Sequence, residues 1–256
     1  MERRAFVKAC VGVAGAAALG SAGLGMARSL VEPRGPSGIV RYFGAHRVGG
    51  PAPRGLPYLP LRRDADGALA VNAEPFSFRG ATYDPLAWCR YCGHQSAPGL
   101  VRGAALDDRL RYWFPPDLGK VVRPWYADKL GEPVRPEDFP DVGFGARVVW
   151  RTPDGAPDAH RLQALVVRVP ALKDARDPVK PAKPLQAGEL ALLQERVFLG
   201  DLVAVFSACT HFCCWAGYKE AEVFARPRNA WENAFCTCHD ANYDAAAPVA
   251  YTFLPS

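Results

Sequence analysis

The sequence predicts an all-β fold with long connecting loops and few helices. Runs of β-branched residues in rough alternation are typical of strands, and a last apolar segment predicts a strand near residue 256. The 256 residues include 24 Gly and 24 Pro, which favours turns over long helices. The expected strands are 146–151, 162–169, 201–209 and 248–256.

Two connecting regions and the overall composition complete this expectation. The segment LDDRLRYWF at 106–114 predicts a short helix, whereas the Pro/Lys-rich stretch 177–188 predicts a surface loop. Hydrophobic residues make up 49% of the chain and charged residues 22%, which is typical of a globular protein. The net charge is +5, but no basic run is interleaved with aromatic residues, so nucleic-acid binding is not expected.

The N-terminal segment carries a targeting pattern. Met1-Glu-Arg-Arg-Ala-Phe-Val-Lys8 resembles a twin-arginine export signal, and it is followed by an uncharged stretch from Ala9 to Ala27. As a helix this stretch would span about 28 Å, close to the hydrocarbon core of a bilayer. Cleavage near Gly25-Met-Ala27 and retention as a membrane anchor are both open from the residues alone, and a buried Ala/Gly helix is the alternative to a signal.

These features divide the chain into three parts. Residues 1–30 are expected to form the twin-arginine signal or membrane anchor. Residues 31–60 hold Pro-Arg-Gly-Pro-Ser and Gly-Gly-Pro-Ala-Pro-Arg-Gly, which predict a tether with little regular structure. The folded domain is expected at 61–256, with the chemistry concentrated in a subdomain at about 207–245.

Two short pieces hold five of the eight cysteines and two of the five histidines. They are Cys-Thr-His-Phe-Cys-Cys-Trp at 209–215 and Phe-Cys-Thr-Cys-His-Asp at 235–240. Each piece offers one thiolate and one imidazole, since Cys209 is followed by His211 and Cys236 by His239. Two side chains so close in sequence can converge on one metal, so the pair of loops predicts a four-ligand site.

This pattern, C-x-H-x-x-C followed by C-x-C-H, resembles that of the Rieske iron–sulfur proteins. The resemblance implies a [2Fe–2S] cluster with Cys209 and Cys236 on one iron and His211 and His239 on the other. It also implies a disulfide between the two remaining cysteines, which would clamp the loops together. That disulfide pair is Cys214 and Cys238.

The resemblance is closest to one branch of the family. A motif with a disulfide is similar to the Rieske subunits of quinol-oxidising cytochrome bc complexes, and the Cys213-Cys214 doublet and Trp88–Gly93 look like archaeal-type or deep-branching members. It is firm over 201–245 and weaker over 80–115. The implied fold is a Rieske-type antiparallel β-sandwich with an inserted cluster-binding subdomain, plus one N-terminal membrane or signal helix.

The implied function is electron transfer from a quinol to a cytochrome or other acceptor. His239 would accept the hydrogen bond of the quinol, and the partners would be a cytochrome b-type membrane subunit and cytochrome c. Such a subunit stays attached to the membrane, so a retained anchor is expected, with the Rieske head on the extracytoplasmic side. The alternatives are the small Rieske subunit of an arsenite-oxidase-type molybdoenzyme and a free electron-transfer protein.

The same residues also fit other kinds of site. The same four ligands suit a structural Cys2His2 zinc site, although zinc explains neither the second cysteine pair nor the export signal. Cys213 is expected to be a small buried thiol, and Cys89 and Cys92 are expected to form a local disulfide or packed thiols. His46 is expected at the surface.

The residues after the last ligand depart from the high-potential Rieske pattern Gly-Ser-x-Tyr. This chain has Asp240-Ala-Asn-Tyr243, so Tyr243 keeps a hydroxyl that can donate to a ligand cysteine sulfur, while Ala241 has no donor at the serine position. Hydrogen bonds to the sulfurs stabilise the reduced state, and a negative charge at Asp240 disfavours it. We therefore expect a low midpoint potential, suited to a quinol such as menaquinol.

Overall fold

The residues that the structure describes fall within the unit Ile39–Phe253. The computed structural model describes residues 40–50, 52, 54–72, 74–78, 81–84, 107–152, 161–172, 185–209, 214, 216–218, 230–232, 234–236, 238 and 240–253. Among these residues no helix is long and apolar enough to span a membrane. The predicted signal segment at 1–30 lies outside the described residues.

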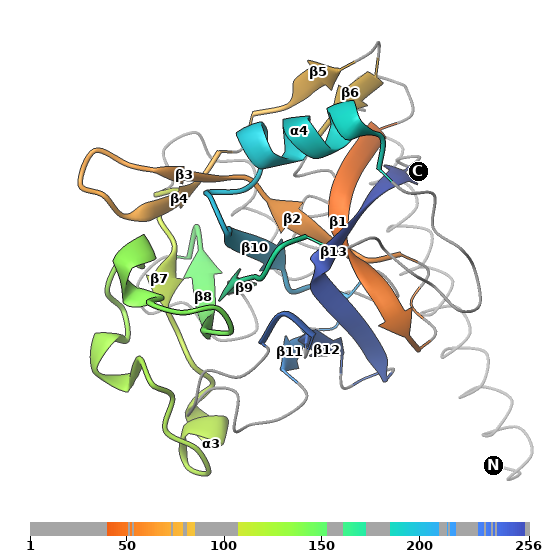
Figure 1. Cartoon of the computed structure of the whole chain (residues 1–256). Coiled ribbons are helices and arrows are strands. Elements are labelled where there is room, and N and C mark those ends of the chain that lie inside the picture. Colours follow the sequence, from red (N-terminus) through yellow and green to blue (C-terminus); the bar gives the residue numbers. More distant parts are fainter. Residues whose placement is uncertain are drawn as a thin grey trace, which may run out of the picture. The chain divides into compact units, whose positions relative to one another are not determined.

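The all-β prediction is confirmed, since strands far outnumber helices among the described elements (Figure 1). The strands are β1 (Val40–Gly49), β2 (Leu56–Leu59), β3 (Leu61–Arg63), β4 (Leu69–Val71), β5 (Phe76–Phe78), β6 (Ala81–Tyr83), β7 (Arg111–Tyr112), β8 (Gly145–Trp150), β9 (Leu162–Arg168), β10 (Leu202–Phe206), β11 (Gly217–Tyr218), β12 (Ala234–Cys236) and β13 (Ala241–Phe253). The helices are α3 (Pro116–Gly119), α4 (Ala187–Arg196) and the 3₁₀ turns η1 (Ala127–Lys129), η2 (Pro136–Asp138) and η4 (Ala230–Glu232).

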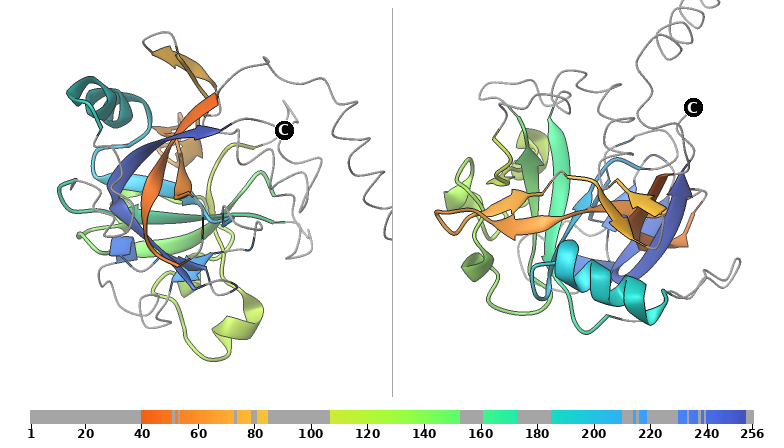
Figure 2. Two further views of the ribbon diagram at one scale, coloured as in Figure 1. Left: turned by 90° about the vertical axis from the view of Figure 1, so that its right-hand side faces the viewer. Right: turned by 90° about the horizontal axis from the view of Figure 1, so that it is seen from above.

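Most strands form one continuous sheet in the order β11-β12-β13-β1-β2-β10-β9-β8-β7. The strands β1 and β13 are its longest pair and lie antiparallel along their length. The left view of Figure 2 shows them side by side. Two irregularities interrupt their register, between Ala45 and His46 and between Arg47 and Gly49. The sheet therefore places β11 and β12 at one end of β13, which becomes the position of the candidate site (Figure 1).

The predicted tether is wrong beyond residue 39. Residues 40–59 contribute β1 and β2, and both strands lie in the middle of the sheet. The Gly/Pro-rich stretch after Gly49 connects these two antiparallel strands. Gly55 allows this because a Cβ there would lie 1.8 Å from the Ala45 carbonyl oxygen. Gly55 thus lies where the connection of the two strands is too crowded for a side chain.

The helix expected at 106–114 is also wrong in its described part, and one helix was missed. Residues 107–114 are extended and include β7, which pairs with β8. The helix α4 follows the predicted loop 177–188, whose last two residues begin it. Its N-terminus carries a capping box between Gln186 and Glu189, and Leu193 is buried in the core.

The core contains many large aromatic side chains in contact. Tyr83 stacks on Phe43 and Phe76, with ring centroids 4.8 and 5.6 Å away. His46 is buried with 3% exposure, so the expectation of a surface histidine is wrong. The cause is the pairing of β1 with β13, which places His46 opposite the buried Asp244.

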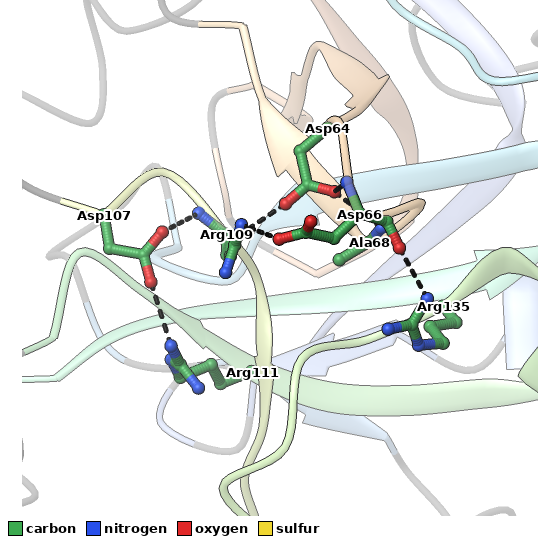
Figure 3. Close-up of polar contacts among 7 residues, drawn as sticks. All are labelled: Asp64, Asp66, Ala68, Asp107, Arg109, Arg111 and Arg135. Carbon is green, nitrogen blue, oxygen red and sulfur yellow. Dashed lines mark hydrogen bonds and ion pairs between the residues drawn. The ribbon is translucent and has the colours of Figure 1, made fainter.

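A network of acidic and arginine side chains fixes the turn between β3 and β4 (Figure 3). The Asp64 carboxylate accepts the amides of Asp66 and Ala68 at 2.9 and 2.8 Å and the Nε of Arg109 at 2.5 Å. Arg109 also pairs with Asp66, and Arg135 donates to the Asp66 carbonyl at 2.7 Å. Desolvation opposes ionisation of Asp64, but the hydrogen bonds from Ala68 and Arg109 outweigh it and lower its pKa.

We expect Asp64→Asn to lower the melting temperature at pH 7 by removing the charge that Arg109 contacts. A carboxylate whose pKa is lowered by folding stabilises the protein above its unfolded pKa of about 4, and this stabilisation disappears as the pH falls through the folded pKa. The difference between variant and parent should therefore shrink as the pH falls below about 4 and through the lowered pKa of Asp64. Thermal unfolding followed by circular dichroism measures this. Asp117→Asn is the control, since Asp117 forms an exposed pair with Lys120; an Asp64→Asn effect that does not change with pH would contradict the prediction.

Candidate metal centre

The first cysteine piece begins directly after β10 and returns beside it. The Cys209 amide donates to the Cys214 carbonyl at 2.8 Å, and the Ala216 amide donates to the Ser207 carbonyl at 2.5 Å. Ser207 in turn donates its amide to Gln163 near the start of β9 at 3.0 Å. These bonds tie Cys209, Cys214 and Ala216 to the core, so the position of Cys209 is set by the sheet.

The second cysteine piece is the connection between β12 and β13. Cys236 and Ala241 face each other in the antiparallel register, as do Ala234 and Tyr243. All four are buried, and side chains of directly opposed residues lie on one face of a sheet. Cys236, Ala241 and Tyr243 therefore share the buried face, as the expectation for Ala241 requires.

Asp240 completes the turn in an unusual conformation. Its φ is 50°, in the left-handed region. The Rieske motif that the sequence resembles has glycine at this position, the residue that adopts such a φ most readily. Gly50 packs directly against the turn, with φ of 80°, and a Cβ there would lie 2.4 Å from the Asp240 carbonyl oxygen. Gly50, directly after β1, thus supports the turn at the end of the second cysteine piece. The sequence did not reveal this role because Gly49-Gly50 looked like part of a tether.

The short strand β11 joins the two pieces. Gly217 and Tyr218 pair with Phe235 and Ala234, so the chain that leaves the first loop lies beside the strand that enters the second. The guanidinium of Arg147 packs on Gly217, where a Cβ would lie 1.7 Å from its Nη2. A side chain at residue 217 would have to displace that guanidinium, which is the far end of a flexible side chain.

Three thiols gather where the two pieces meet. The sulfur atoms of Cys214, Cys236 and Cys238 all lie within 4.8 Å of one another. Cys236 is buried, Cys214 is half-buried and Cys238 is exposed. Thiolates suit soft and borderline metals, including zinc, copper(I) and iron–sulfur clusters. This cysteine group could therefore hold a metal ion.

Cys209 lies beside this group and contacts Tyr243. Its sulfur is 3.2 Å from the Tyr243 hydroxyl oxygen, and both side chains are buried. The contact between Tyr243 and a cysteine sulfur that the sequence predicts is thus present. The Cys209 thiol also forms a hydrogen bond with that of Cys236, and this bond, followed by burial, raises the pKa of Cys236. The sulfurs of the two cysteine pieces are therefore in direct contact.

Burial shifts the pKa values of the neighbouring groups as well. It raises the pKa of the Cys214 thiol to about 11, with further contributions from hydrogen bonding and charge at Cys238. Burial, then the charge and the hydrogen bond of Cys209, raises the pKa of Tyr243. These groups are protonated at neutral pH, so a bound metal ion must displace protons from the thiols.

The structure brings together Cys209, Cys214, Cys236, Cys238 and Tyr243 from the predicted set. His211 and His239 lie outside the described residues, as do Cys213 and the Cys89/Cys92 pair. Cys214 and Cys238 are free thiols in contact, so the disulfide between them stays a prediction. The closeness of Cys236 to both was missed, because spacing along the chain does not report distances between loops.

Comparison with known proteins does not assign the chain to a family. No protein-family model, no curated protein and no solved structure matches the chain.

The raised pKa of Cys214 predicts slow alkylation. At about pH 8, a pKa near 11 lowers the thiolate fraction about 100-fold relative to an ordinary thiol, and the greater nucleophilicity of the more basic thiolate recovers about tenfold. Cys214 should therefore react with iodoacetamide roughly tenfold more slowly than an ordinary half-buried cysteine, and its rate should keep rising with pH to about 11. Peptide mass spectrometry of the reduced protein measures this, with the exposed Cys238 as the internal reference. A Cys214 rate that levels off near pH 9 would contradict the prediction.

Proposed function

We propose that the chain is a Rieske-type iron–sulfur protein that serves as the electron-transfer subunit of a quinol-oxidising complex. The observation that carries this proposal is the contact between Cys209 and Cys236, one from each cysteine piece, with the Tyr243 hydroxyl 3.2 Å from the Cys209 sulfur. A phenolic donor aimed at a buried thiol is an arrangement that tunes a redox centre. The large sheet, antiparallel along its main path, is consistent with the antiparallel β-sandwich that the motif implies.

The donor set fits a [2Fe–2S] cluster of the Rieske type. The two buried cysteines in contact would hold one iron, and His211 and His239, in the same two sequence pieces, would hold the other. When bound, the cluster would accept and release one electron. The exposed Cys238 directly precedes His239, so the chain next to this histidine reaches solvent, where a quinol could approach.

The residues around the thiols have separate parts in this function. Tyr243 would donate its hydroxyl hydrogen to the Cys209 sulfur and favour the reduced state. Asp240 is exposed, so solvent would screen the unfavourable charge that the sequence suggests there. His239 would accept the hydrogen bond of the quinol and take up its proton.

The partners follow from this role and are equally proposals. A cytochrome b-type membrane subunit would provide the quinol site, and cytochrome c or another acceptor would receive the electron. Residues 1–30 would anchor the chain, with the Rieske head on the extracytoplasmic side of the cell membrane. A quinol-site inhibitor that shifts the electron paramagnetic resonance spectrum would distinguish this role from that of a free electron carrier.

The proposed ligands can be tested one at a time. The dithionite-reduced protein should contain two irons per chain and give a Rieske-type electron paramagnetic resonance spectrum. Cys209→Ser, His211→Ala, Cys236→Ser and His239→Ala should each abolish the spectrum, whereas Cys92→Ser should keep it. Zinc in place of iron would refute the proposal, and a full signal in Cys236→Ser would refute the choice of Cys236 over Cys238.

The position of Ala241 predicts in which direction a substitution there shifts the midpoint potential. It shares the buried face with Cys236, so a serine there would present a hydroxyl to the cysteine sulfurs. Ala241→Ser should raise the midpoint potential, because a hydrogen bond to sulfur stabilises the reduced state, and Tyr243→Phe should lower it. Redox titration of the protein measures both. Ala245→Ser is the control for burying a hydroxyl elsewhere on β13, and an unchanged midpoint in Ala241→Ser would exclude residue 241 from the surroundings of the cluster.

A further inference from the structure

We infer that the reduced, cluster-free protein binds one soft metal ion through the thiolates of Cys214, Cys236 and Cys238, and that a Cys214–Cys238 disulfide closes this site. The three sulfurs lie within 4.8 Å of one another. This site differs from the proposed cluster site because it uses no histidine and includes both cysteines of the expected disulfide. The two sites share Cys236.

The geometry suits a single ion. A tetrahedral metal with metal–sulfur bonds of about 2.3 Å places its sulfur ligands about 3.8 Å apart. The three thiols therefore need to move together by about 1 Å or less. Cys214 and Cys238 both lie outside the strands, Cys238 in the connection of β12 to β13. This adjustment can occur without breaking the pairing of Cys236 in β12.

The three thiolates determine which metal ions the site prefers. Three thiolates without carboxylates favour zinc, cadmium and copper(I) over magnesium or calcium. The Cys214 thiol already contacts those of both Cys238 and Cys236 through hydrogen bonds. An ion would replace the protons of this group and coordinate all three sulfurs. Cys238 is exposed and offers the ion a path from solvent.

Oxidation would remove two of the three ligands. In thiol–disulfide exchange with oxidised glutathione, Cys214 and Cys238 lose two protons and two electrons and form one S–S bond, while the oxidant becomes two reduced glutathione molecules. Cys236 is then the remaining thiol of the three. The consequence for the cluster rests on the proposed function. The disulfide would keep Cys236 available for the cluster, whereas a soft metal bound earlier would block cluster assembly.

The metal site can be tested without the cluster. In a His211→Ala/His239→Ala background, reduced and stripped of metal, we expect one cadmium ion per chain, with the absorption of cadmium–thiolate charge transfer in the ultraviolet. Cys214→Ser and Cys238→Ser in this background should each weaken cadmium binding at least tenfold, whereas Cys92→Ser should leave it unchanged. Unchanged affinity in Cys214→Ser, or loss in Cys92→Ser, would overturn the site.

Two further measurements use the unsubstituted cysteines, so they do not depend on variants that fail to fold. Bound cadmium should protect Cys214, Cys236 and Cys238 from alkylation but not Cys89 or Cys92, and equal protection of all five would overturn the site. Treatment with oxidised glutathione should abolish cadmium binding, and reduction should restore it. Undiminished binding by the disulfide form, or a disulfide that includes Cys236, would overturn the closure. Failure of the Rieske spectrum in the parent protein with cadmium binding intact would refute the proposed function and leave this site standing.

Discussion

The antiparallel pairing of β13 with β1 is the interaction on which the candidate metal centre depends. Along most of its length β13 is buried and paired with β1, and its first residues pair with β12. The Tyr243 hydroxyl reaches the Cys209 sulfur from the same end of the strand. One strand therefore connects the hydrophobic core, the second cysteine piece and the sulfur of the first.

Part of the fold could be predicted because its signals are local. Runs of β-branched and other apolar residues identify β8, β9 and β10 correctly, since strands that are almost entirely buried carry near-continuous apolar sequences. The strand β1 has no such pattern and lies next to Gly/Pro-rich segments, so its residues were interpreted as part of a tether. Its structure comes from pairing with β13, about 200 residues later, which no window of sequence reveals. The expectation that His46 lies at the surface was wrong for the same reason.

The candidate site, like the fold, could be predicted only where its signals are local. The spacing of Cys209, Cys214, Cys236 and Cys238 indicated two loops around one centre, and the described thiols do meet. The spacing could not show that the sulfur of Cys236 lies within 4.8 Å of those of both Cys214 and Cys238. Nor could it show that Gly50 packs on the turn at Asp240, because both contacts arise from the packing of distant strands.

The register of β1 against β13 also determines how the domain would bear mechanical load. Val40 pairs with Phe253 at one end of the ladder, whereas Gly49 pairs with Asn242 at the end that adjoins the thiols. Tension applied through the residues before Val40, with the thiol end held by a partner, would act along the axes of the two strands. The hydrogen bonds of this ladder would then share the force in shear, instead of opening one after another. A domain that is pulled while docked would in this way keep the surroundings of its sulfurs intact.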